Sequence, residues 1–140
     1  MTTIAWDGKT LAADSRYVNG NTAWRGGKLY RLANGGLFAG CSDAGAVNAV
    51  VEWLNGVEKQ KPVIDKETGF AGLLIRADKS VWYLDRYLSP QAVSQSFIAI
   101  GSGRDFALAA MHLGRSAAAA VEVASVFDIY TDSLVTSLEL

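Results

Sequence analysis

The chain opens with the stretch Met1-Thr-Thr-Ile-Ala-Trp-Asp-Gly-Lys-Thr-Leu-Ala-Ala-Asp-Ser-Arg16, whose pattern predicts a β-hairpin. Residues 2–6 are rich in β-branched and aromatic side chains, Asp7-Gly8 is a strong two-residue turn signal, and residues 9–14 return as the second strand. Alternation along both segments predicts half-buried strands. Because most chain termini are poorly ordered, a strand that starts at residue 2 would be unusual in holding the start of the chain inside a sheet.

The composition indicates one soluble globular domain, residues 1–140. The hydrophobic fraction of 50% and the charged fraction of 19% argue against disorder. The net charge of −1 gives no electrostatic reason to bind nucleic acid or a membrane surface. No apolar run approaches the roughly 20 residues of a membrane span, and the start lacks the apolar region of a signal peptide. The single Cys41 excludes an internal disulfide, so we expect a cytoplasmic protein.

The remaining pattern predicts strands, one helix, strands, a helix pair and a final strand, which is the order of an α+β layered sandwich. Expected strands lie at 28–32, 37–40, 70–77, 80–84, 96–100 and 129–140, and residues 17–27, 59–69 and 89–90 are expected to be loops. The expected helices are one capped by Ser42 or Asp43, one with Phe106, Ala109, Ala110 and Leu113 on its buried face, and one capped by Ser116 with Ala117, Ala120, Val121 and Ala124 on its face.

Thr2 combines two chemically useful groups if Met1 is removed, and methionine removal tolerates a small second residue of this kind. A free α-amine has a pKa of roughly 7.7–8 and can act as a general base. A threonine hydroxyl needs such a base to become a nucleophile. Taken alone the signal is weak, since many chains begin with Met-Thr.

Further segments make the signal specific. The opening Thr2-Thr-Ile together with Ala12-Ala-Asp-Ser-Arg16 resembles the start of proteasome β-type subunits and of the bacterial HslV peptidase, which are N-terminal-nucleophile (Ntn) threonine peptidases. The same family is matched by Gly27-Lys-Leu-Tyr-Arg-Leu32, Phe38-Ala-Gly40 and Ile98-Ala-Ile-Gly-Ser-Gly103, so that the resemblance covers residues 2 to about 131. It implies the αββα four-layer sandwich of Ntn hydrolases, with two stacked antiparallel sheets flanked by helices. One outer helix is expected to be lost, because residues 59–69 contain Pro62 and have no helical period.

The resemblance also implies a role for each matching residue. Thr2 Oγ is the expected nucleophile, Lys28 the cation that favours its alkoxide, and Asp14 the carboxylate that holds Lys28. The N–H of Gly40 is expected to bind the oxyanion. Ser102 is expected to hydrogen-bond the Thr2 amine and to relay its proton.

Three other polar residues are weaker candidates. Glu122 and Ser125 fall where the family often has Asp and Ser that position the terminal amine, although Glu in place of Asp is a departure. His112, the only histidine, is expected on a helix surface rather than in a catalytic triad or a zinc site. Cys41 is expected to be a small packed residue.

The predicted function is that of a threonine-type endopeptidase with no metal or cofactor. The resemblance further implies a homo-oligomeric ring of identical subunits, an AAA+ ATPase unfoldase as partner, and peptide or unfolded protein as substrate. The apolar helix faces at 47–54 and 117–126 are expected to pack between subunits. Two alternatives remain open: an Ntn amidase acting on a small amide, and a catalytically silent ring-forming subunit.

Overall fold

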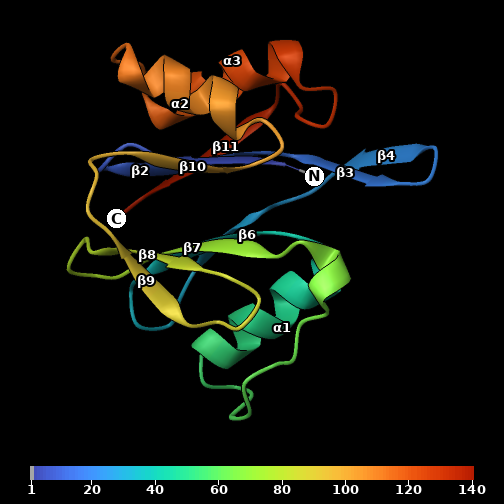
Figure 1. Ribbon diagram of the computed structural model, residues 1–140, viewed down its shortest axis with the longest axis vertical. Helices are drawn as coiled ribbons and strands as arrows, with labels where there is room; N and C mark the ends of the chain where they lie inside the picture. The colour runs from blue at the N-terminus through green and yellow to red at the C-terminus, as the bar shows by residue number, and fades with distance from the viewer. Residues whose placement is uncertain (1) are drawn as a thin grey trace. The chain divides into compact units, whose positions relative to one another are not determined.

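The computed structural model describes residues 2–140 and is an α+β protein with three α-helices and three β-sheets (Figure 1). The chain divides into two compact units, one formed by residues 2–29 and 95–139 and the other by residues 30–94 with residue 140. The predicted α+β class is confirmed. Among the described residues, no helix is both long enough and apolar enough to cross a membrane.

The predicted N-terminal hairpin lies at the centre of the first unit. Its strands are β1 (Thr3–Trp6) and β2 (Thr10–Asp14), and Gly8 in the turn adopts a φ of 95°, which favours glycine. The sheet has the order β10-β1-β2-β11, with outer strands β10 (Ile98–Gly101) and β11 (Val135–Glu139). Pairing is antiparallel throughout, and Ile4 lies opposite both Ala13 and Ile100. The start of the chain is therefore held between two strands.

The prediction that the hairpin strands are half-buried is wrong, because both of their faces are buried. Ile4 and Ala5 are neighbours on opposite faces, and neither has any exposed surface. The alternation in this stretch is one of size, not of polarity. Small residues such as Ala5 and Ala12 contact the helices, whereas their neighbours Ile4 and Leu11 are large.

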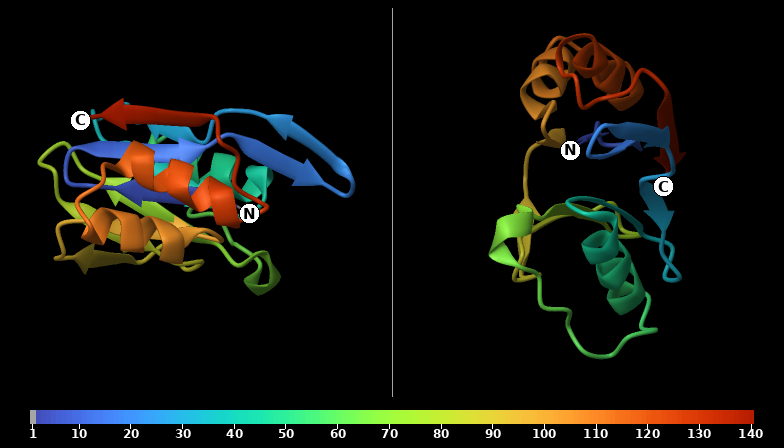
Figure 2. Two further views of the ribbon diagram at one scale, coloured as in Figure 1. Left: turned by 90° about the horizontal axis from the view of Figure 1, so that it is seen from above. Right: turned by 90° about the vertical axis from the view of Figure 1, so that its right-hand side faces the viewer.

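Helices α2 (Arg104–His112) and α3 (Ala117–Phe127) lie side by side on one face of this sheet (Figures 1 and 2). Ser116 caps α3 as predicted, by accepting a hydrogen bond from the backbone N–H of Ala119. The predicted alanine face of α3 is also confirmed, since its members are all buried: Ala117, Ala120, Val121 and Ala124. These small side chains let α3 approach the sheet closely. This face is therefore occupied within the chain and cannot pack between subunits as predicted.

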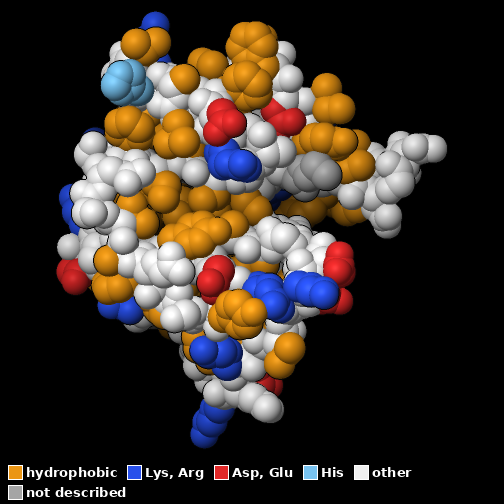
Figure 3. Space-filling model, in the orientation of Figure 1, with side chains coloured by type: hydrophobic (Ala, Val, Ile, Leu, Met, Phe, Trp, Pro, Cys, Tyr) orange, Lys and Arg blue, Asp and Glu red, His pale blue; other side chains and the backbone are white. Residues whose placement is uncertain are grey.

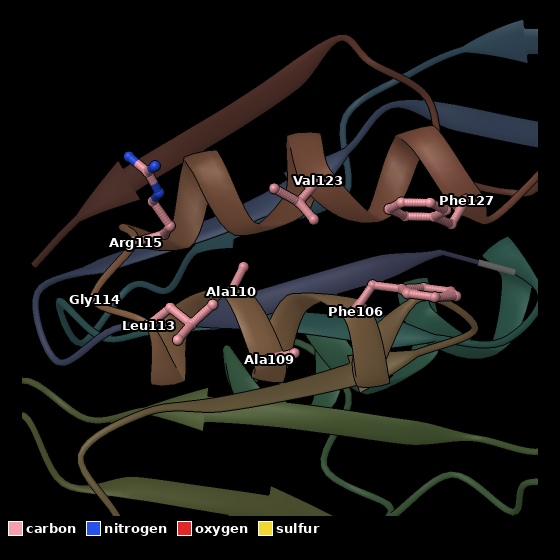
Figure 4. Close-up of a pocket in the computed structure, with 8 residues that line it drawn as sticks. All are labelled: Phe106, Ala109, Ala110, Leu113, Gly114, Arg115, Val123 and Phe127. Carbon is pink, nitrogen blue, oxygen red and sulfur yellow. The ribbon is translucent and has the colours of Figure 1, made fainter.

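The predicted buried face of α2 is wrong except at Ala110. Phe106 is 39% exposed and Leu113 is 81% exposed, while the buried residues on this helix are Ala107, Ala110 and Met111. The stripe that contains Ala107, Ala110 and Met111 faces inward because α2 packs against both the sheet and α3. The large side chains instead line a groove of about 420 Å³ between the two helices, where Phe106 stacks on Phe127 (Figure 4).

Residues 17–27, predicted as a loop, contain a second hairpin. Its strands are β3 (Arg16–Asn19) and β4 (Thr22–Arg25), joined at Gly20 with a φ of 59°. Asn19, Gly20 and Asn21, which suggested a loop, form the turn, and Gly26 and Gly27 follow β4. The hairpin extends beyond the four-stranded sheet and is exposed along most of its length (Figures 1 and 2).

The second unit is a five-stranded sheet with the order β5-β6-β7-β8-β9 and helix α1 (Ala44–Leu54) packed on it. Its strands are β5 (Leu29–Arg31), β6 (Leu37–Cys41), β7 (Ala71–Ile75), β8 (Val81–Leu84) and β9 (Pro90–Val93). Asp43 caps α1, as one of the two predicted caps. The predicted loop at 89–90 is wrong, since Pro90 begins an edge strand, where its missing N–H is tolerated. Between α1 and β7 the chain forms only a 3₁₀ turn, Lys66–Thr68, in agreement with the predicted lack of a long helix there.

The carboxylate of Asp7 joins the hairpin turn to the start of α3. It accepts backbone hydrogen bonds from Lys9, Thr10 and Ala117 at 3.0, 2.8 and 2.8 Å. Burial raises the pKa of Asp7, but these N–H groups together outweigh burial and leave the pKa below its ordinary value. Asp7 is thus ionised at neutral pH and stabilises two elements that are far apart in sequence.

We expect Asp7→Ala to lower the free energy of unfolding at pH 7 by about 2–3 kcal/mol, the scale of hydrogen bonds to a charged group. Because the pKa is lower in the folded state, this stabilisation is present above the unfolded-state pKa of about 3.9 and is lost as the pH falls through the folded-state pKa. Urea unfolding at pH 7 and pH 3 measures the difference, with the exposed Asp105→Ala as the matched control. If Asp7→Ala lowers the free energy of unfolding by the same amount at pH 7 and pH 3, this account is contradicted.

Candidate active site

Three of the predicted residues converge at the start of the N-terminal hairpin. Thr2 immediately precedes β1, Asp14 ends β2, and Lys28 immediately precedes β5. All three are buried, with 3% of Thr2, none of Asp14 and 5% of Lys28 exposed. A buried lysine and a buried aspartate are costly unless they are paired.

The side chains of these residues form one hydrogen-bonded group. Lys28 Nζ donates to Thr2 Oγ1 at 2.7 Å and lies 3.1 and 3.2 Å from the two carboxylate oxygens of Asp14. Thr2 Oγ1 in turn donates to Asp14 Oδ1 at 2.5 Å. The threonine hydroxyl therefore contacts both an ammonium and a carboxylate, which also contact each other.

Backbone groups hold the carboxylate of Asp14 in place. Its Oδ1 accepts from the N–H of Thr3 at 3.0 Å, and its Oδ2 accepts from the N–H of Arg16 at 3.0 Å and of Asp132 at 3.2 Å. These donors supply hydrogen bonds to a carboxylate that has no exposed surface. The position of Lys28 is consequently set by the hairpin backbone as well as by the ion pair.

A second polar group adjoins the first. Ser102 Oγ lies 3.2 Å from the carbonyl oxygen of Thr2, and it donates to Asp128 Oδ2 at 2.6 Å. Thr131 Oγ1 donates to the same carboxylate oxygen at 2.6 Å and lies 2.7 Å from Thr3 Oγ1. Ser102 thus lies between the backbone of Thr2 and the carboxylate of Asp128, a residue that the sequence pattern did not predict here.

Asp128 is ionised despite partial burial. Burial raises its pKa, but hydrogen bonds from the hydroxyls of Ser102 and Thr131 and from the N–H of Tyr130 bring the pKa below its ordinary value. A negative charge at this point favours a cation near the backbone of Thr2. The usable signal in the sequence is Asp128-x-x-Thr131, an acid and a hydroxyl three residues apart directly after α3.

Glu122 and Ser125, which were predicted to position the amine, are not part of this group. Both lie on α3, where Glu122 is exposed and Ser125 Oγ donates to the backbone carbonyl of Glu122 at 2.6 Å. Neither side chain bonds to the residues around Thr2 within residues 2–140. Helix α3 continues to Phe127, so the chain turns toward Thr2 only at Asp128.

Steric crowding explains why the residue that ends the Gly-Ser-Gly motif, Gly103, is a glycine. A Cβ placed on Gly103 would overlap Thr3 Oγ1 and would lie 3.0 Å from the Cβ of Ala124. The hydroxyl of Thr3, which contacts Thr131, therefore occupies the space that a side chain at position 103 would fill. Gly101, at the end of β10, has a φ of 100°, which also favours glycine.

The other predicted residues have these surroundings. Gly40 is a buried residue of β6 paired with Gly72, and a Cβ there would lie 3.2 Å from Val47 and 3.3 Å from Phe38. Packing therefore explains why the residue is small, and its oxyanion role stays a prediction. Cys41 is buried, as expected of a small packed residue. His112 is exposed at the end of α2, in agreement with the prediction, and is the pale blue side chain of Figure 3.

The β3–β4 hairpin is joined to the site by arginine side chains. Arg25 Nε donates to Asp132 Oδ2 at 2.6 Å, and this hydrogen bond lowers the pKa of Asp132 although burial raises it. Arg16 donates to the carbonyl oxygen of Ile129 at 2.8 Å. Since the N–H of Asp132 also binds Asp14, the segment from 129 to 132 connects the hairpin to the carboxylate beside Thr2.

The described residues contain no cluster of three or more His, Cys, Asp or Glu side chains that could hold a metal ion. The apolar groove between α2 and α3 is lined by none of the polar residues around Thr2.

No protein-family model matches the sequence, and no curated protein matches it. Solved structures do match. Thiobacillus denitrificans BPH in complex with epoxomicin has a TM-score of 0.75 and 19% identity, covering 99% of this chain and 97% of that chain. Another structure of Thiobacillus denitrificans BPH has a TM-score of 0.71 and 18% identity, covering 99% and 96%. Eukaryotic HslV from Trypanosoma brucei has a TM-score of 0.67 and 17% identity, covering 99% of each chain.

These matches extend over nearly the whole chain and over nearly the whole of each neighbour. The chain therefore has the fold of the HslV and BPH proteasome-like proteins. The resemblance predicted from the sequence is confirmed at the level of the fold.

Proposed function

We propose that this protein is an N-terminal threonine peptidase of the proteasome/HslV type, active once Met1 has been removed. The observation that carries the proposal is the buried hydroxyl of Thr2, which has Lys28 Nζ at 2.7 Å and the carboxylate of Asp14 at 2.5 Å. A threonine hydroxyl in an ordinary structural role has no need of a buried ammonium beside it. The HslV and BPH fold supports the same reading.

In the proposed reaction, Thr2 Oγ attacks the carbonyl carbon of a peptide bond while the free Thr2 amine takes the hydroxyl proton. Lys28 stabilises the negative charge that develops on the oxygen, and Asp14 holds Lys28 in position. The C–N bond breaks, the proton passes to the leaving amine, and an ester forms between Thr2 and the acyl group. A water molecule then hydrolyses the ester, with the Thr2 amine again as the base.

The second polar group positions the terminal amine in this proposal. Ser102 Oγ lies 3.2 Å from the carbonyl oxygen of Thr2, the residue that carries the amine in this proposal. The ionised Asp128 behind it stabilises the amine when it carries the extra proton. Asp128 and Thr131 replace Glu122 and Ser125 in this role.

The oxyanion donor of the proposal is the backbone N–H of Gly40. This assignment requires the αββα arrangement in which the two larger sheets stack, and we include that arrangement in the proposal. One such donor contributes about 2.7–4 kcal/mol to transition-state stabilisation.

A peptide epoxyketone such as epoxomicin tests the proposal, because its two electrophilic centres bond both the hydroxyl and the amine of an N-terminal threonine. We expect mass spectrometry of a chain beginning at Thr2 to find one adduct, located on Thr2. A Thr2→Ala chain is the control and should not react. Failure of the Thr2 chain to form the adduct would contradict the proposal.

Substrate turnover separates the proposed peptidase from the two alternatives. An unstructured protein such as casein should be cleaved faster than small amides if the enzyme is an endopeptidase. The reverse order would favour an Ntn amidase. Absence of both activities in the Thr2-initiated chain would favour a silent subunit.

We further propose that the active form is a cytoplasmic ring of identical subunits served by an AAA+ unfoldase. Apolar side chains gather over α2 and α3, at the top of Figure 3, and Val126 and Phe127 are among the exposed ones. Exposed apolar patches of this kind favour association. Light scattering on a size-exclusion column should find a closed oligomer at micromolar concentration, whereas a stable and active monomer would contradict the assembly.

A further inference from the structure

The aromatic ring of Tyr17 lies against the ammonium of Lys28. The distance from Lys28 Nζ to the centre of the ring is 5.2 Å, within the range of a cation–π interaction. Tyr17 belongs to β3, in the exposed second hairpin, whereas the ammonium is buried beside Thr2 and Asp14. One side chain thus connects a surface hairpin to the cation of the proposed site.

Several contacts hold this ring in its position. The ring of Trp24, across the hairpin, stacks on it with centroids 5.9 Å apart and an angle of 11° between the planes. The phenol hydroxyl of Tyr17 donates to the carbonyl oxygen of Gly27 at 2.8 Å. A Cβ on Gly26 would lie 2.9 Å from the ring, so the absence of a side chain there makes the space for it.

The ring of Tyr17 attracts the ammonium of Lys28. An aromatic ring carries partial negative charge on its face and attracts a cation, most strongly where water is excluded. Lys28 is 5% exposed, so its ammonium has exchanged most of its hydration for the hydroxyl of Thr2, the carboxylate of Asp14 and this ring.

We propose that Tyr17 is a positioning residue for the reaction at Thr2, acting through Lys28, and that Trp24 sets the orientation of its ring. The inference rests on the proposed function and deepens it. It predicts that the rate of attack by Thr2 depends on the electron density of the ring at position 17 and not only on the size of that ring.

The test uses the Thr2-initiated chain and measures both the maximal rate of inactivation by a peptide epoxyketone and its half-saturating concentration. Tyr17→Phe keeps the aromatic ring and loses the hydrogen bond to Gly27. Phenylalanines that carry one to three fluorine atoms at position 17 keep the shape of the ring and reduce the negative charge on its face. We expect Tyr17→Phe to react within about 2-fold of the natural chain, and the rate to fall stepwise with each fluorine. Tyr17→Leu should react about 3- to 30-fold more slowly, the scale of one cation–π contact. The half-saturating concentration should change little.

Trp24→Leu is the matched control, because it removes the stacked partner and leaves the ring beside Lys28. We expect Trp24→Leu to lower the maximal rate of inactivation less than Tyr17→Leu does. Equal rates across the fluorine series overturn the inference even if Tyr17→Leu does not fold, since shape is constant within the series. If the natural Thr2-initiated chain forms no adduct, the proposed function itself is wrong and this inference falls with it.

Discussion

Replacing Lys28 by methionine is expected to lower the rate of peptide cleavage by a factor on the order of 10³–10⁶, the scale seen when a member of a coupled catalytic group is lost. Methionine keeps the length of the side chain but removes the ammonium that lies 2.7 Å from Thr2 Oγ1. Without it the developing alkoxide has no cation beside it. Thr2→Ala, which removes the nucleophile, should lose as much activity, and the double variant should lose little more than either single variant.

The structure also predicts how the fold responds to this change. Removing one partner of a buried ion pair costs about 3–5 kcal/mol, because Asp14 would then be a buried charge without a counterion. The backbone N–H groups of Thr3, Arg16 and Asp132 remain as donors to it and limit the loss. Combining Lys28→Met with Asp14→Asn removes both charges, and this pair should unfold at a higher temperature than Lys28→Met alone while staying inactive.

Activity is measured as release of a fluorophore from a peptide substrate, and folding is monitored by circular dichroism. The matched control is Lys9→Met, since Lys9 is an exposed lysine in the hairpin turn. Turnover close to that of the natural chain by a folded Lys28→Met protein would exclude the proposed mechanism.

Removal of Met1 is expected to switch activity on. While Met1 is attached, the nitrogen of Thr2 belongs to a planar amide whose lone pair is delocalised, so it cannot accept a proton near neutral pH. The free α-amine is then on the preceding residue, about 3.8 Å further along the chain by Cα spacing. In that form the hydroxyl proton of Thr2 is directed at Asp14 Oδ1.

The experiment compares a chain released from an upstream fusion so that it starts at Thr2 with one that retains Met1. The first should cleave peptides and react with the epoxyketone, and the second should do neither. A chain released with one extra glycine before Thr2 controls for the release procedure and should also be inactive. Equal activity in the Met1 and Thr2 chains would mean that Thr2 is not an N-terminal nucleophile.

Local sequence was sufficient for elements whose partners are near in the chain. The hairpin of β1 and β2 follows from β-forming residues on either side of Asp7-Gly8, and the inward face of α3 follows from the helical spacing of its small residues. The family resemblance likewise predicts that Thr2, Asp14 and Lys28 lie close together. These features depend on period, turn chemistry and motif order, which are all properties of the chain itself.

The local sequence pattern did not predict the structure where the same residues could pack in more than one way. Helix α2 presents two adjacent apolar stripes, and only its packing against the sheet and α3 decides that Ala107 is buried and Leu113 exposed. The residues of β3 and β4 satisfied the description of a loop, because a hairpin with both faces exposed lacks the apolar alternation of a half-buried strand.

The sequence by itself therefore predicted that Thr2, Lys28 and Asp14 act together, and their catalytic roles stay a prediction. Only the tertiary structure decided that Asp128 rather than Glu122 is the acid beside Ser102, and that Tyr17 covers Lys28. The physical reason is that hydrogen bonds and ring contacts require distances within a few ångströms. Such distances between residues 26 positions apart, as for Ser102 and Asp128, depend on where α3 ends and how the following turn folds back.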